Sequence, residues 1–310
     1  MRRSGSALRG LGVVTLKELS DHLTSARMRV LEWLVVLVAL AAVYGAIQQI
    51  RDVTAEDPFL FLRLFTTARD PLPSFVAFLG FLVPMMAIGL GFDAVNGEHS
   101  RRTLSRILSQ PIYRDALLFG KFLAGLGTMA ISLVALWLLV IGLGLIMLGV
   151  PPGGEEMARA FIFLLVTIAY AGVWLALAML FSIVFRSAAT AALVTLGLWL
   201  FLTLIWPALA VAQAFVSPDS EATLVITTQM LARLSPSTFY GEAMLALLHP
   251  ATRSLGPVYI SDLQGALMGS PLPLWDSVMI AWPQIVGLIA AGILLFVGGY
   301  VAFQRQEVRA

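Results

Sequence analysis

The 310-residue sequence contains no cysteine and few charged residues. Without cysteine the chain can form no disulfide, no thiolate metal site and no cysteine nucleophile. Charged residues make up 12% of the chain, against roughly 25% in soluble domains, whereas 59% of the residues are hydrophobic. Polar surface is too scarce to cover a soluble core of this size, so lipid is the solvent that suits the chain. The net charge of +2 is too small to indicate a nucleic-acid partner.

Six mostly apolar runs approach or exceed the roughly 20 residues with which a helix crosses a bilayer. They are Val30–Ile50, Phe75–Phe92, Phe122–Val150, Ala160–Phe185, Ala188–Val216 and Ser277–Phe303. The sequence therefore predicts an all-α membrane protein with six transmembrane helices. In the fifth run, Trp206-Pro207 predicts a kink or break, because proline removes a backbone hydrogen bond.

Lysine and arginine are unevenly spread over the segments between the runs. Most of the 20 lie before Val30, in the Asp93–Lys121 loop, at Arg186 and after Phe303. Basic residues that flank spans stay on the cytoplasmic side. This distribution predicts a multi-pass protein of the cell membrane with both termini in the cytoplasm.

Two segments outside the runs have helical patterns. The N-terminal region 1–29 has leucines near helical spacing opposite Arg9, Lys17 and Glu18, which predicts an amphipathic helix. Such a helix can lie along the membrane surface or pack on the loop after the second span, and the pattern leaves both placements open. Segment 217–276 alternates helical stretches with proline and glycine turns, which predicts a small helical cap on the outer side.

The spans carry almost no titratable groups. Five of the six runs have no Asp, Glu, Lys, Arg or His, and Glu32 stands near the start of the first. Glu32 can be read as a carboxylate that reaches the cytoplasmic interface or as a residue at membrane depth. Ion-coupled carriers keep ionisable residues at depth, so the pattern disfavours proton-driven transport. Hydroxyl side chains remain as the polar lining of a path: Thr128, Ser132, Thr167, Thr195 and Thr203.

The sequence contains no complete motif for catalysis or nucleotide binding. Gly120-Lys121 resembles the end of a phosphate-binding loop, but Asp115 and Phe122 stand where that loop needs Gly and Ser or Thr. The three histidines lie outside the apolar runs, and no GxSxG sequence occurs. We therefore expect no catalytic residue, no metal-ligating residue and no cofactor in this chain.

The Asp93–Lys121 loop carries the most specific polar pattern. From Thr103 to Ser109 it predicts a short helix with Leu104 and Leu108 on one face and Arg106 on another, and Pro111 ends that helix. Read by composition alone, the loop is a charged turn whose arginines only fix the topology.

The second span with the following FDAVNGEHSRRTLSRILSQPIYRDALLFGK resembles the permeases of ABC-2-type ABC transporters, most closely their NosY-like branch. LSPSTFY in the outer segment and the ending AFQRQEVRA are also similar to this group. The resemblance implies that residues 30–310 form the six-span permease domain and that the N-terminal helix is the elbow helix of the family. It implies a second permease copy, as a homodimer, and two copies of a separate cytoplasmic ATPase that binds ATP and Mg.

The resemblance also implies that segment 93–115 is the coupling segment that enters a cleft of the ATPase. The residues expected at that interface are Asp93, Gly97, Glu98, Arg101, Arg102, Leu104, Arg106, Leu108 and Arg114. The resulting hypothesis is an exporter subunit that moves an apolar or amphipathic substrate. The alternative is a membrane-embedded mechanotransmitter or anchor that passes ATPase motion to an extracytoplasmic partner. An intramembrane hydrolase lacks a nucleophile, a base and metal ligands in any workable arrangement.

Overall fold

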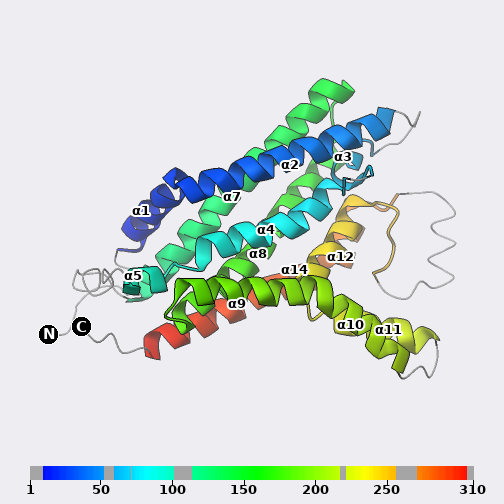
Figure 1. Cartoon of the computed structure of the whole chain (residues 1–310). Helices are drawn as coiled ribbons and strands as arrows, with labels where there is room; N and C mark the ends of the chain where they lie inside the picture. The colour runs from blue at the N-terminus through cyan, green and yellow to red at the C-terminus, as the bar shows by residue number, and fades with distance from the viewer. Residues whose placement is uncertain are drawn as a thin grey trace.

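The computed structural model describes residues 10–51, 59–70, 72–100, 114–216, 221–255 and 271–305, and these residues form helices joined by short connections (Figure 1). Six helices have the length and apolar composition of membrane spans, which confirms the predicted fold class. They are α2 (Ala26–Arg51), α4 (Phe75–Gly91), α7 (Arg114–Leu148), α8 (Gly154–Val184), α9 (Ala188–Leu200) with its continuation α10 (Trp206–Val216), and α14 (Leu274–Arg305).

The short helices lie at the two ends of the bundle. At one end are α1 (Leu11–Thr24), α5 (Asn96–Ser100) and the last turns of α14, and at the other are α3 (Arg63–Thr66) and α12 (Pro236–Leu248) (Figure 1). We call the first the inner end and the second the outer end. The basic residues predict that the inner end faces the cytoplasm.

Helix α7 is longer than the apolar run that predicted it. It begins at Arg114 rather than Phe122 and has 35 residues, about 52 Å at 1.5 Å per residue. The hydrocarbon core of a bilayer is only about 30 Å thick. The first turns of α7, which carry Asp115 and Lys121, therefore continue past the apolar region at the inner end.

Helix α8 forms the centre of the bundle, where Tyr170 and Trp174 are fully buried. It packs against α4, α7, α12 and α14. Helices α4 and α8 approach closely where both carry small residues. A Cβ at Gly91 of α4 would lie only 2.7 Å from the Cβ of Ala178 of α8, so this approach requires glycine. Helix α14 runs in the same direction beside α8, with Gly292 facing Val173 at ordinary contact distance.

The fifth span has its irregularity where the sequence predicts one. Between α9 and α10 the residues Phe201–Ile205 form a π-helical turn, η1, directly before Trp206-Pro207. Pro207 has no N–H to donate to the carbonyl of Thr203, and a wider turn absorbs the lost bond without breaking the span.

Two helices lie in the described part of the predicted cap, α11 (Glu221–Ala232) and α12. Helix α12 packs lengthwise against α8. Near its start, the Ser237 Oγ is 3.0 Å from the Tyr170 hydroxyl, and at its end the Leu247 carbonyl accepts from Arg159 Nη1 at 2.9 Å. Tyr170 lies 11 residues beyond Arg159 along α8, so α12 reaches about 16 Å down beside the spans. Residues 217–220 and 256–270 of the predicted cap lie outside the described residues.

The predicted N-terminal helix forms as α1 and packs along the first turns of α7. A Cβ at Gly120 would lie 2.7 Å from Val14 Cγ1, so glycine is what allows this approach. At the junction with α2, the Ser25 Oγ accepts from the Met28 amide at 3.1 Å, as an N-cap does. Glu32, one and a half turns into α2, accepts a hydrogen bond from Ser132 of α7 at 2.9 Å.

Candidate functional site

The turn that follows α4 is anchored to the end of α8. The Val95 and Asn96 amides donate to Ser182 Oγ at 3.0 and 3.2 Å, and Asn96 Nδ2 donates to the Phe185 carbonyl at 3.3 Å. Val95 and Asn96 are buried, so these bonds satisfy polar groups that water does not reach. The start of the predicted coupling segment is therefore fixed to the central helix of the bundle.

A buried lysine joins three helices beside this turn. Lys121 of α7 is 6% exposed, and its Nζ lies 2.7 Å from Glu98 Oε1 of α5 and 3.2 Å from Glu18 Oε1 of α1. The two carboxylate side chains are 15% and 11% exposed. A buried charge is stable only when it is paired, so Lys121 fixes α1 and α5 to the start of α7. We call Lys121, Glu18 and Glu98 the buried triad.

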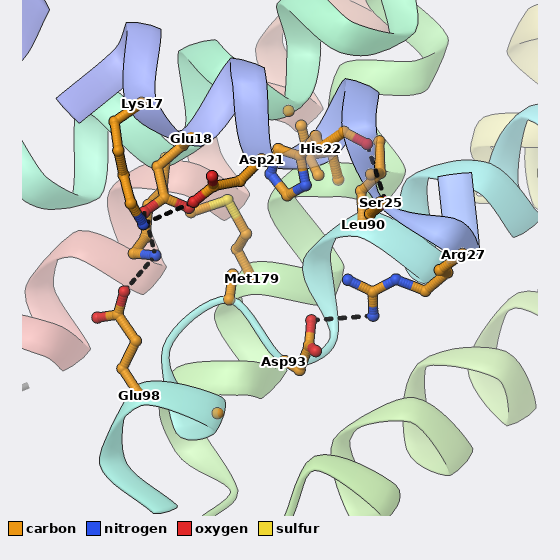
Figure 2. Close-up of a pocket in the computed structure, with 15 residues that line it drawn as sticks. Lys17, Glu18, Asp21, His22, Ser25, Arg27, Leu90, Asp93, Glu98 and Met179 are labelled. Atoms are coloured by element: carbon orange, nitrogen blue, oxygen red, sulfur yellow. Dashed lines mark hydrogen bonds and ion pairs between the residues drawn. The ribbon is translucent and has the colours of Figure 1, made fainter. Parts of the chain in front are cut away.

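Three further ion pairs adjoin the triad (Figure 2). Arg27, at the start of α2, lies 3.2 Å from Asp93 and stacks over the ring of Phe92 at 5.1 Å. On α1, Lys17 lies 2.9 Å from Glu18 and 2.9 Å from Asp21, and the side chains of Lys17 and Asp21 are both 59% exposed. The Arg27 pair ties the turn after α4 to α2, whereas the exposed Lys17–Asp21 pair contributes little.

The surroundings set the protonation of two groups on α1. Burial by itself raises the pKa of Glu18, but the ammonium groups of Lys121 and Lys17 outweigh it, and the pKa is lowered overall. Burial lowers the pKa of His22, and Lys121 and Arg27 lower it further against the opposing effect of Glu18 and Asp93. At neutral pH the site therefore holds a carboxylate at Glu18 and a neutral imidazole at His22.

A small pocket of about 200 Å³ opens among these groups. Its walls come from α1, from the start of α2, from the end of α4 with α5, and from α7 and α8, and Figure 2 shows the side chains that line it. A displacement of α5 must therefore move α1 and α7 or break the ion pairs of Lys121, and it must move α8 or break the hydrogen bonds to Ser182. The arrangement suits mechanical coupling.

Four of the residues predicted at the ATPase interface lie in the described part of the chain. Asp93 and Glu98 lie in the ion pairs described above, Gly97 donates its amide to the Asp93 carbonyl at 3.1 Å, and Arg114 begins α7. Five of the predicted residues lie outside the described residues: Arg101, Arg102, Leu104, Arg106 and Leu108.

Sequence reasoning missed the partners of these residues. It assigned Glu18 to the polar face of an amphipathic helix and gave no role to His22, Arg27 or Ser182. The signal available was the charged i, i+4 spacing on α1, but that spacing says nothing of a partner about 100 residues away.

A second buried cation lies at the outer end of α8. Arg159 is fully buried; it donates to Glu155 Oε1 at 2.8 and 3.0 Å, to the Leu247 and Leu272 carbonyls at 2.9 and 2.6 Å, and to Ser277 Oγ at 3.0 Å. These bonds tie the start of α8 to the end of α12 and to the start of α14. Helix α8 is thus anchored by hydrogen bonds at its inner end and by a cation at its outer end.

Comparison with known proteins gives concordant results. The family model described as "ABC-2 family transporter protein" matches residues 13–308. A probable ABC transporter permease protein NosY of Stutzerimonas stutzeri is 25% identical over 243 residues, which cover 78% of this chain and 82% of that protein. The protein of the same description from Pseudomonas aeruginosa PAO1 is 27% identical over 225 residues, which cover 70% of this chain and 79% of that protein.

Proposed function

Because the chain belongs to the ABC-2 family of transporter proteins, we propose that the buried triad and the turn after α4 form the site through which an ATPase drives it. The chain is the multi-pass permease subunit of an ABC transporter. It has no ATPase domain of its own, and the partner ATPase subunit binds the ATP.

The observation that carries this proposal is the buried Lys121. It holds α5, the described start of the predicted coupling segment, to α1 and α7 through Glu98 and Glu18. The same turn is bonded to Ser182 of α8. A push on α5 is therefore delivered to packed helices rather than absorbed by a loose loop, as transmission between discrete states requires.

We further propose that the inner end faces the cytoplasm and that two copies of the chain pair with two ATPases. Six spans make half of a pathway, and closed two-fold symmetry is the commonest way to complete one. The fifth span supports this, because Leu193, Leu200 and Leu204 are 71%, 40% and 60% exposed and a second copy can cover them. The uncharged runs favour an apolar or amphipathic cargo.

The test is to disturb α5 and follow ATPase coupling. Glu98→Lys places a cation beside Lys121, and we expect the permease still to insert into membranes while it no longer stimulates its cognate ATPase. Asp21→Asn is the matched control, because Asp21 belongs to the exposed pair with Lys17 and its loss leaves the triad intact. Wild-type ATPase stimulation by the Glu98→Lys permease would refute the assignment of the coupling site.

A second candidate function, transmission of ATPase motion to an extracytoplasmic partner, is favoured by the geometry of α8. This helix runs without interruption from Ser182, bonded to the turn after α4, to Arg159, bonded to α12 and α14. Vesicles that contain only permease and ATPase distinguish the two. ATP-dependent movement of a fluorescent lipid analogue in them supports the exporter, and ATP hydrolysis without such movement supports the transmitter.

A further inference from the structure

A charged network joins the turn between α11 and α12 to the last span. Arg233 Nε donates to both carboxylate oxygens of Glu242 at 3.1 and 2.9 Å, and its Nη2 donates to the Leu255 carbonyl at 2.9 Å. Gln284 of α14 donates its Nε2 to Glu242 Oε2 at 2.9 Å. We call Arg233, Glu242 and Gln284 the outer polar network.

The network lies well below the outer end of the bundle. The level of that end is given by Ser277, which accepts from the buried Arg159 at 3.0 Å. Gln284 follows Ser277 by seven residues along α14, which is about 10 Å further into the bundle. Glu242 precedes Leu247, another acceptor of Arg159, by five residues along α12, or about 7 Å.

One member of the network is partly exposed at this depth. The Arg233 side chain is 33% exposed, whereas Glu242 is 15% exposed and already accepts from two donors. A cation that faced hydrocarbon here would cost about 2.5–3.5 kcal/mol even on the mild scale for helix insertion. On this cost we expect the exposed edge of Arg233 to face water that enters from the outer end.

Apolar side chains lie beside this cation. Met230, three residues before Arg233, is 66% exposed, and Leu234 is 64% exposed. The Arg233 amide still bonds the Gln229 carbonyl at 3.0 Å, so the chain keeps its helical path directly after α11, and residues three and four apart share one face there. The turn after α11 therefore presents a cation flanked by open apolar surface. That pairing of chemistries fits a ligand with an anionic group on an apolar chain.

We propose that the outer polar network is a binding site for the anionic headgroup of an amphipathic cargo. An anion is favoured because the more exposed partner of the ion pair is the guanidinium, and the N–H groups of a guanidinium bind phosphate and carboxylate oxygens with charge-assisted hydrogen bonds. Glu242, itself bonded by Gln284, holds the guanidinium in place. Met230 and Leu234 contact the first carbons of the acyl chain. This assignment rests on the proposed function, since it names the class of cargo that the permease moves.

The absence of cysteine makes water access directly measurable. Leu234→Cys places a single thiol next to Arg233, and Ile289→Cys places one on α14 at the level of Tyr170, three residues before Gly292 and 48% exposed. In lipid nanodiscs we expect a membrane-impermeant maleimide to label Leu234→Cys at least tenfold faster than Ile289→Cys. Equal rates would show that Arg233 faces lipid and would overturn the proposal.

The anionic preference is tested with two lysolipids of the same acyl chain. Lysophosphatidylglycerol should slow the labelling of Leu234→Cys at least threefold, and lysophosphatidylcholine should not. Arg233→Gln in the Leu234→Cys background should abolish that protection, whereas Arg253→Gln, which removes another cation of the outer end, should preserve it.

Equal protection by both lysolipids would overturn the anionic assignment. That comparison leaves the network unaltered, so it stands even if the Arg233→Gln variant does not fold. The labelling assay uses the permease chain without an ATPase, so a negative result would not affect the coupling proposal. A negative result in the Glu98→Lys test would likewise not affect the proposed headgroup site.

Discussion

Replacing Lys121 by methionine removes the cation that two nearly buried carboxylates share. Lys121 is 6% exposed, with oxygens of Glu98 and Glu18 at 2.7 and 3.2 Å. Removing one partner of a buried ion pair costs roughly 3–5 kcal/mol, because the remaining charge is left uncompensated. The carboxylates keep 15% and 11% exposure, and Glu18 keeps Lys17 at 2.9 Å, which places the expected cost at the lower end, about 3 kcal/mol. Opening of α1 away from α7 should then become roughly 100-fold more favourable.

Hydrogen exchange of the permease in nanodiscs measures this opening. Amides of α1, Leu11–Thr24, should lose roughly 100-fold in protection in the Lys121→Met variant. Asp21→Asn is the matched control on the same helix, because it leaves both cations of Glu18 in place. Both side chains of the Lys17–Asp21 pair are 59% exposed, and an exposed pair contributes about 1 kcal/mol or less, so protection of α1 should fall by no more than roughly fivefold.

A compensated variant separates electrostatics from packing. In Lys121→Met with Glu18→Gln and Glu98→Gln no carboxylate is left unpaired, and most of the α1 protection should return, because a buried ion pair replaced as a whole is often neutral. Two results would refute the reasoning. One is a loss of less than fivefold in Lys121→Met, and the other is a triple variant as labile as the single one.

Two further predictions concern the same end of the bundle. Gly91→Ala puts a Cβ 2.7 Å from that of Ala178 and should lower the melting temperature by roughly 5 °C, the effect of about 2 kcal/mol of overpacking. Gly142→Ala is the control, because no atom of the described residues would lie within 4 Å of its Cβ, and equal melting temperatures for the two variants would contradict the packing. The pKa of His22 is lowered by burial and by the nearby Lys121, so the docked helix α1 favours the neutral imidazole. The stabilisation that His22 gives to docked α1 is therefore complete above the usual histidine pKa of about 6.5, and it is lost as the pH falls through the lowered pKa. Protection of α1, corrected for intrinsic exchange, should therefore fall between pH 7 and pH 5, and a His22→Gln variant with the same fall would contradict the assignment.

The spans were predictable from the sequence because hydropathy and length are local properties. The apolar runs located every span, and Pro207 marked the irregular turn at η1 because the loss of an N–H is decided by one residue. The helix ends were less accurate. Helix α7 begins eight residues before its apolar run, because a helix continues past the membrane wherever its backbone bonds can, whereas hydropathy marks only the lipid boundary.

The functional contacts were not predictable in the same way. The pairing of Glu18 with Lys121 joins residues about 100 positions apart, and either charge alone is typical of a polar helix face. Arg233 and Glu242 fall between two apolar runs, so the pattern placed them in a cap on the outer side. Their depth follows from the packing of α12 on α8, including the stacked rings of Tyr170 and Tyr240 at 4.4 Å, and no single sequence reveals such a pairing.

Two buried cations, Lys121 at the inner end and Arg159 at the outer end, constrain how the permease can move. Ser182, beside the triad, and Arg159 are 23 residues apart on one uninterrupted helix, about 35 Å at 1.5 Å per residue. A helix packed on α4, α7, α9, α12 and α14 is expected to move as a rigid element rather than by bending. Arg159 binds α12 and α14, and Glu242 and Gln284 of the outer polar network lie on those two helices, so a tilt of α8 driven from α5 would move the side chains that hold Arg233. The proposed coupling site and the proposed headgroup site would then communicate with no charged residue in the spans between them, which is consistent with the uncharged runs of the sequence.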